Sequence, residues 1–254
     1  MYPRLFGFVK SWGLLLALSF VLGIMLSVRR GRQRGIEPDA VMDISFAVMV
    51  SSLIGVRLAY VLTHLGQFDP WYRIFFIWDG GLTLYGGVAL AIAAVWWTAR
   101  RRGIAFLRIA DVLAPGVILG IGVTRIGCFL AGCCYGKPTD LPWGVHFPST
   151  CRAGIEFGEQ AIHPAQLYSS AAGFLVFGLL LWLEKPAAPA GLTFGRFLLF
   201  YGAARFLLEF TRFIEADQLM ALGLSNNQWI SLALVITGIA VLSYAVRQAH
   251  ARDA

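Results

Sequence analysis

Three arginines lie inside apolar stretches of the sequence: Arg57, Arg125 and Arg205. A guanidinium at the depth of a bilayer costs about 2.5–3.5 kcal/mol on insertion scales, so it occurs where it faces a polar interior and has a partner or an anionic ligand. The abundant anion at that depth is the phosphate of a phospholipid. A planar guanidinium can donate two parallel hydrogen bonds to a phosphodiester. The three arginines therefore predict a site that binds a phospholipid headgroup.

Arg205 begins a charged series with Glu209 and Arg212, which follow four and seven residues later. This spacing places all three side chains near one face of a helix. A buried carboxylate between two arginines stays ionised and holds the guanidiniums in place. The two cations exceed the single anion, so the group can bind a further anion. An ion network that only fixes helix packing is the alternative.

A histidine opens the fifth apolar stretch in the sequence IHPAQLY, where Gln166 and Tyr168 follow His163. Imidazole side chains change protonation near neutral pH and serve as general bases. We therefore predict that His163 accepts a proton from a nucleophile. The alternatives are that it bonds lipid headgroups or only marks the membrane interface. Tyr85 is the second candidate base, although a phenol in this role needs strong help from nearby cations.

Two glycine pairs flank Tyr85 in the sequence IWDGGLTLYGG: Gly80 with Gly81, and Gly86 with Gly87. Glycine pairs let the backbone approach a helix or a ligand closely, and they can turn backbone N–H groups toward an anion. Both pairs are therefore candidates for substrate binding. Close helix packing is the alternative for the second pair.

Four cysteines lie at or beyond the end of the fourth apolar stretch: Cys128, Cys133, Cys134 and Cys151. On an oxidising side of a membrane, a disulfide from Cys151 to Cys133 or Cys134 is the simplest interpretation. Free thiols that pack as small hydrophobic side chains and a redox-active pair are the alternatives. The spacing does not match a zinc finger or ribbon, so no metal is predicted.

The composition places these residues in an integral membrane protein. Of 254 residues, 58% are hydrophobic and only 14% are charged, and the mean hydropathy is +0.69. Apolar runs of about 20 residues are long enough to span a bilayer as helices. Seven such helices are expected in a single all-α domain over residues 1–254. They are expected at residues 11–28, 41–63, 82–99, 109–130, 164–183, 193–212 and 228–246. The fourth run contains Pro115 and several glycines, which can interrupt a helix.

The distribution of basic residues predicts the orientation of the chain. Loops after the first, third, fifth and seventh runs carry most of the Lys and Arg outside the runs. Such loops are retained in the cytoplasm, so we expect the N-terminus outside and the C-terminus inside. The net charge of +7 reflects this anchoring, and no soluble basic region is available to bind nucleic acid. The proline- and aromatic-rich loop 131–162 is expected to form a structured cap on the outer, periplasmic side.

Four motifs in this order, IWDGGLTLYGG, TRIGCFLAGCCYG, IHPAQLY and GAARFLLEFTR, resemble those of the bacterial prolipoprotein diacylglyceryl transferase family. The resemblance covers nearly the whole chain. It implies an inner-membrane enzyme that moves the diacylglyceryl group of phosphatidylglycerol to the lipobox cysteine of a prolipoprotein and releases glycerol 1-phosphate. The implied partners are phosphatidylglycerol, prolipoprotein signal peptides and the lipid bilayer, with no cofactor. We expect a monomer.

The resemblance assigns activity to Arg125 and Arg205, with Glu209 as the partner carboxylate. His163 and Tyr85 complete the predicted catalytic set. The motifs and the buried charges together predict a set of substrate-binding residues: Arg57, Asp79, Gly80, Gly81, Gly86, Gly87, Gly127, Gly136, Gln166, Tyr168, Glu209 and Arg212.

The chain departs from the family pattern at several positions. Tyr85 stands where the family usually has a histidine, and Ser169 stands where a glutamate usually follows the IHPAQLY motif. Cys128 and Cys133 replace an asparagine and a glutamate. The phosphate-binding half of the site is kept, whereas the proton-handling half is altered. The alternatives are therefore a relative with a thiol-redox or lipid-binding role, or a different acceptor. A transporter is a third alternative, which the clustering of charges near one end of the helices disfavours.

Overall fold

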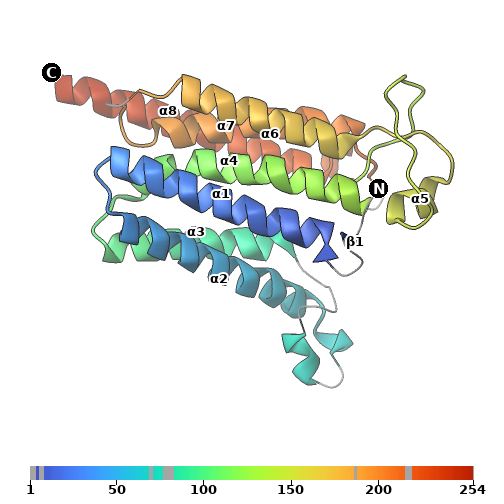
Figure 1. Cartoon of the computed structure of the whole chain (residues 1–254). Coiled ribbons are helices and arrows are strands. Elements are labelled where there is room, and N and C mark those ends of the chain that lie inside the picture. The colour runs from blue at the N-terminus through green and yellow to red at the C-terminus, as the bar shows by residue number, and fades with distance from the viewer. Residues whose placement is uncertain are drawn as a thin grey trace. The chain divides into compact units, whose positions relative to one another are not determined.

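The computed structural model of the chain describes residues 4–5, 9–68, 71–76, 83–185, 188–214 and 219–253. This part of the chain is mostly helical, as predicted (Figure 1). Its long helices each overlap one of the seven predicted apolar runs. They are α1 Ser11–Gln33, α2 Pro38–Thr63, α3 Leu84–Arg101, α4 Phe106–Ala131, α6 Ala165–Trp182, α7 Leu192–Leu208 and α8 Asn226–Asp253.

Shorter elements connect the long helices. Strands β1 Arg4–Leu5 and β2 Val9–Lys10 form an antiparallel hairpin before α1. Helix α5, Arg152–Phe157, lies in the loop between α4 and α6. Single turns of 3₁₀-helix are η1 Leu65–Gln67, η2 Trp71–Phe75, η4 Glu209–Thr211 and η6 Ala221–Gly223.

Five of the described helices are long and apolar enough to cross a membrane: α1, α2, α4, α6 and α8. Helix α7 has only 17 residues, and α3 ends in the basic pair Arg100 and Arg101. Many large apolar side chains on the candidate spans are exposed, among them Met25, Leu175 and Ile236. Helices that are apolar on their outer faces are typical of proteins surrounded by lipid.

Helix α4 is continuous over 26 residues although Pro115 lies inside it. The interruption considered from the sequence therefore does not occur, as is common for proline in membrane helices, where neighbouring groups satisfy the freed backbone carbonyl. The glycines of α4 instead allow close packing. A Cβ atom at Gly116 would lie 2.7 Å from the carbonyl oxygen of Gly23 in α1. Small residues at such contacts let membrane helices approach closely.

The chain divides into two compact units, one comprising Met1–Ser27 with Ala110–Ala254 and the other Val28–Ile109. In the second unit, α2 packs against α3 where their glycines meet. A Cβ atom at Gly86 would lie 2.3 Å from the carbonyl oxygen of Gly55. The interpretation of the second glycine pair as a helix contact is thus confirmed. That the whole chain is a single domain stays a prediction.

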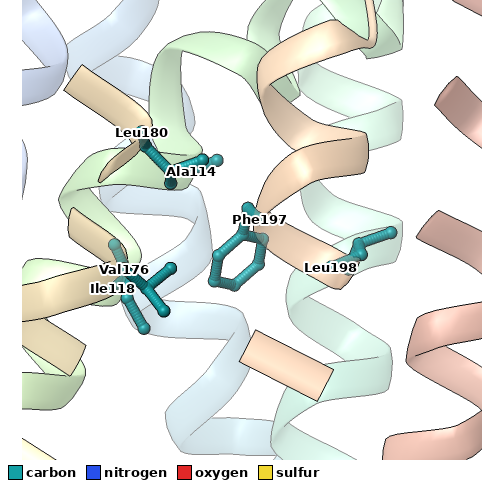
Figure 2. Close-up of a cluster of buried hydrophobic side chains, with 6 residues drawn as sticks. All are labelled: Ala114, Ile118, Val176, Leu180, Phe197 and Leu198. Carbon is teal, nitrogen blue, oxygen red and sulfur yellow. The ribbon is translucent and has the colours of Figure 1, made fainter. Parts of the chain in front are cut away.

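In the first unit, a buried apolar cluster joins α4, α6 and α7 (Figure 2). Its members are Ala114, Ile118, Val176, Leu180, Phe197 and Leu198. The buried carboxylate of Asp111 in α4 fixes the start of α7, because it accepts hydrogen bonds from the backbone nitrogens of Gly191 at 2.8 Å and Phe194 at 2.7 Å. The N-terminal ends of α4 and α7 therefore lie together.

The loop 131–162, here called the cap, is structured, as predicted. It contains α5 and two β-bridges, which pair Ile162 with Pro138 and with Val145. Buried side chains of Phe147, Cys151 and Ile162 form its small core. Figure 1 shows α5 beyond the ends of α4 and α6.

Candidate functional site

Arg125 and Arg205 face the same narrow pocket between α4, α6 and α7. The side chains that line it are Ile121, Arg125, Ser169, Ala172, Gly173, Tyr201, Ala204, Arg205 and Leu208. Their meeting follows from the fold. Arg125 lies 14 residues after Asp111, and Arg205 lies 11 residues after Phe194. At 1.5 Å per residue, Arg125 lies about 21 Å along α4 from Asp111, and Arg205 lies about 17 Å along α7 from Phe194. The two arginines therefore reach similar depths on helices whose N-terminal ends are hydrogen-bonded to each other.

The free volume of this pocket is about 10 Å³. This is close to the space that one water needs. A headgroup can therefore enter only when the lining side chains move apart. Ser169 gives this wall a neutral hydroxyl at the position where the family resemblance leads one to expect a glutamate. Its hydroxyl donates to the carbonyl oxygen of Ala165 at 2.8 Å.

Glu209 is the centre of a buried ion network. One carboxylate oxygen, Oε2, pairs with Arg205 and with Arg212 Nη1, the latter at 3.3 Å. The other, Oε1, accepts from Ser225 Oγ at 3.0 Å and Asn227 Nδ2 at 2.7 Å. The carboxylate side chain is 1% exposed. The predicted shared face of the three charged residues is confirmed, and two guanidiniums share one carboxylate.

Two buried polar atoms have no hydrogen-bond partner in the part of the chain that the structure describes: Arg212 Nε, a donor within this network, and Gln166 Oε1, an acceptor in the first turn of α6. Leaving such groups unpaired costs about 1–3 kcal/mol each. The amide of Gln166 is oriented by its other end, because Nε2 donates to the carbonyl oxygen of Cys133 at 2.8 Å. Both atoms are therefore available to bind a polar ligand.

His163 lies at the junction of the cap and α6, and it is not among the residues that line the pocket. Its Nδ1 is 3.3 Å from the hydroxyl of Tyr168, which also accepts from Trp143 Nε1 at 2.7 Å. The backbone nitrogen of His163 donates to the carbonyl oxygen of Lys137 at 2.9 Å. The imidazole is thus held in a defined orientation, and its role as a base stays a prediction.

The second unit holds Arg57, Tyr85, Gly86 and Gly87. Arg57 is buried, and its Nε donates to the carbonyl oxygen of Ile74 at 2.7 Å. Tyr85 lies in the first turn of α3, and it is exposed. The predicted substrate-binding residues Asp79, Gly80 and Gly81 lie outside the described residues. Substrate binding by this group of residues stays a prediction.

Gly127 and Gly136 also allow close packing. A Cβ atom at Gly127 would lie 3.2 Å from the Cα atom of Trp12, and one at Gly136 would lie 2.4 Å from the carbonyl oxygen of His163. Gly136 forms a β-bridge with Arg212. It therefore lets the cap cross closely over the segment that carries the ion network.

The expected disulfide from Cys151 is not formed, because all four cysteines are free thiols. Cys151 lies in the core of the cap, where its Sγ donates to the carbonyl oxygen of Pro148 at 3.2 Å. Cys128, Cys133 and Cys134 instead gather, with their sulfur atoms within 4.8 Å of one another. The physical reason is a tight turn after α4, in which Gly132 and Cys134 adopt positive φ angles of 66° and 58°.

The surroundings of Cys133 and Cys134 shift the pKa values of their thiols in opposite directions. Hydrogen bonds from Cys128 and Cys133, together with the nearby guanidiniums of Arg125 and Arg212, hold the pKa of Cys134 well below its usual range despite burial. Hydrogen bonding to Cys128 and Cys134 and burial raise the pKa of Cys133. A single thiolate shared by neighbouring thiol donors is the state that these contacts favour.

Several residues that build the site were not predicted from the sequence. Asp111 had a usable signal, because a lone carboxylate inside a long apolar run is itself unusual. Tyr201 lies four residues before Arg205, so the helical spacing could have placed it beside that arginine. Ser225 and Asn227 had no such signal, since they reach Glu209 only through the packing of α7 on α8.

The sequence matches a protein-family model described as prolipoprotein diacylglyceryl transferase over residues 4–244. The chain is 36% identical over 253 residues to a phosphatidylglycerol–prolipoprotein diacylglyceryl transferase of Vibrio atlanticus, with 96% of this chain and 89% of that protein covered. It is 36% identical over 251 residues to the protein of that name from Pseudoalteromonas atlantica, with coverages of 94% and 86%. For the Clostridium tetani protein of that name, identity is 32% over 241 residues, with coverages of 94% and 95%.

Proposed function

The chain belongs to the prolipoprotein diacylglyceryl transferase family, and we propose that the pocket lined by Arg125 and Arg205 binds phosphatidylglycerol. The diacylglyceryl group of this lipid is then transferred to a prolipoprotein cysteine. The protein is a multi-pass membrane protein of the bacterial inner membrane and a transferase of lipoprotein biosynthesis. The observation that carries the assignment of the site is the convergence of Arg125 and Arg205 on one pocket, beside a carboxylate that cannot neutralise all the positive charge.

The proposed topology has seven spanning helices, with the N-terminus outside, the C-terminus cytoplasmic and the cap on the periplasmic side. Five helices meet the length and hydropathy that spanning requires. Helix α7 is included because it packs beside α4 and α6 through the apolar cluster, and α3 because it packs closely on α2. The basic residues at the C-terminal end of α3 suit a cytoplasmic anchor.

The proposed reaction forms one bond and breaks one. The sulfur of the acceptor cysteine attacks the glyceryl carbon that bears the phosphate, and a thioether forms as the carbon–oxygen bond breaks. The electron pair of that bond leaves with the phosphate, which departs as glycerol 1-phosphate. The proton of the thiol passes to a base, for which we propose His163, with Tyr85 as the alternative.

The arginines are suited to stabilise the leaving group. The phosphodiester carries one negative charge, and the departing phosphate monoester gains a second as the carbon–oxygen bond breaks. Cations beside it therefore interact more strongly with the transition state than with the bound lipid, which is the condition for catalysis. Glu209 holds Arg205 and Arg212 in position, and the unpaired Arg212 Nε supplies a further donor for the phosphate. The unpaired Gln166 Oε1 is an acceptor, which suits a hydroxyl of the glycerol headgroup.

The test of the site is transfer activity in Arg125→Ala and Arg205→Ala. Each variant is expressed in bacteria depleted of their own transferase, and lipidated prolipoprotein is followed by its mobility. Removing one oxyanion-stabilising donor typically lowers the rate by about 10²–10³-fold, and a similar loss is expected here. Arg196→Ala is the matched control, because Arg196 lies on the same helix as Arg205 but donates to the carbonyl oxygen of Leu183, at the C-terminal end of α6. Full activity in both pocket variants contradicts the proposal.

The test of the base compares His163→Ala with Tyr85→Phe. We expect the histidine variant to lose transfer and the tyrosine variant to retain it. A general base contributes about 10²–10⁴-fold to the rate. The opposite pattern would move the role to Tyr85 while leaving the phosphate site in place, so the two assignments are tested separately.

A further inference from the structure

Three thiols form a compact cluster that the proposed transfer reaction does not use. Cys128 lies in the last turn of α4 and is buried, and Cys133 and Cys134 follow at the start of the cap. The three sulfur atoms lie within 4.8 Å of one another. A fourth His, Cys, Asp or Glu does not join this group among the residues whose placement is described.

The backbone holds this arrangement in place. Cys134 adopts a φ of 58°, a left-handed conformation that is uncommon for a residue with a side chain and that is found where surrounding contacts enforce it. The backbone nitrogen of Cys133 donates to the carbonyl oxygen of Cys128 at 3.1 Å, which closes the turn. On the other side, Gln166 donates to the carbonyl oxygen of Cys133. The thiols are therefore pre-arranged rather than brought together by chance rotamers.

Three sulfur ligands set the class of metal. With metal–sulfur bonds of about 2.3 Å, a trigonal ion separates its ligands by about 4.0 Å, which three sulfurs within 4.8 Å reach by small side-chain rotations. Thiolates favour soft ions such as univalent copper, or zinc. Structural zinc usually takes four ligands in a tetrahedron, whereas the cluster offers three. The donor set fits univalent copper better.

The charges around the cluster are consistent with this ion. Three thiolates and one univalent cation carry a net charge of −2. Arg125 and Arg212 both act on Cys134 and supply two positive charges. A buried charged centre requires such compensation. We propose that Cys128, Cys133 and Cys134 form a three-sulfur site for a univalent copper ion, next to the lipid-phosphate site, with which it shares the charge of Arg125 and Arg212.

The proposal is tested on the full-length protein in detergent, reduced and kept free of oxygen. Univalent copper is added in competition with the chelator bathocuproine disulfonate. We expect the wild-type chain to retain one copper ion. Cys128→Ser and Cys133→Ser should each weaken copper binding by more than about 100-fold, because even changes to groups beyond the direct ligands cost about 10- to 100-fold. Cys151→Ser is the matched control and should bind as the wild type does, since Cys151 lies in the cap core.

Failure of the wild-type chain to retain copper overturns the proposal, as does an equal loss in Cys151→Ser. Retention of zinc in the absence of copper retention overturns the choice of ion. If the serine variants do not fold, a measurement on the copper-loaded wild-type chain still tests the proposal. X-ray absorption at the copper edge should show only sulfur in the first coordination shell, and nitrogen or oxygen neighbours there would contradict the assignment.

Discussion

Substitution of Glu209 by glutamine isolates the charge of the buried carboxylate, because the two side chains are nearly equal in size. Glu209 accepts hydrogen bonds from Arg205, Arg212, Ser225 and Asn227. Removing one partner of a buried ion pair costs about 3–5 kcal/mol, since the other charge remains without compensation. The side chains of Arg205 and Arg212 are 12% and 18% exposed, so some solvent screening remains. We therefore expect a loss of about 3 kcal/mol, at the lower end of that range.

The assay is thermal unfolding of the purified protein in detergent. For a protein of this size, 1 kcal/mol shifts the melting temperature by about 2–4 °C, so Glu209→Gln should lower it by about 6–12 °C. Asn227→Ala is the matched comparison, because it removes one hydrogen bond to the charged group and should cost only about 1.5–3 kcal/mol.

The same substitution separates stability from lipid binding. Glu209→Gln raises the net positive charge of the network, so vesicles containing phosphatidylglycerol should still bind, while transfer falls because Arg205 loses its orienting partner. A melting temperature unchanged from wild type, or a larger loss in Asn227→Ala than in Glu209→Gln, would refute the view that this carboxylate holds the arginines.

Two further predictions concern the scaffold that positions the site. Asp111→Ala leaves the backbone nitrogens of Gly191 and Phe194 without their acceptor, and we expect a loss of about 2–4 kcal/mol, measured as a lower melting temperature and reduced transfer. Gly86→Ala places a Cβ atom 2.3 Å from a backbone oxygen of α2 and should destabilise the protein by about 1–3 kcal/mol, whereas Gly178→Ala, with open space around it, should leave the melting temperature at or above that of the wild type.

Much of the helical framework could be predicted, because the length of an apolar run is a local property of the sequence. All seven runs became helices, and the differences are at their ends, such as α8, which continues to Asp253. The fourth predicted run, residues 109–130, is a helix as expected, since the loss of one backbone hydrogen bond at Pro115 does not end a helix whose neighbours pack closely on it. The cap was predicted as a structured element but not in its pairing, which depends on contacts between distant residues.

The candidate site divides in the same way. The contact of Glu209 with Arg205 and Arg212 could be predicted, because helical spacing alone brings the three side chains together. That Arg125 and Arg205 serve one site was predicted as well, but the reason they meet was not, because it depends on Asp111 aligning the starts of two helices far apart in the sequence. The cysteine pairing was predicted wrongly. A left-handed turn at Gly132 and Cys134 gathers three sulfurs and leaves Cys151 apart, and backbone angles of this kind are weakly encoded in the sequence.

The β-bridge between Gly136 and Arg212 couples the cap to the segment that follows α7 and η4. The backbone nitrogen of Lys137 donates to Thr211, and that of Phe213 donates to Tyr135. A cap that swings outward must either carry the Arg212 backbone with it or break both bonds, at about 0.5–1.5 kcal/mol each. Redesigning the cap to recruit another acceptor protein would therefore also change the position of Arg212 and the affinity for the donor lipid. The specificities for acceptor and donor would have to be engineered together.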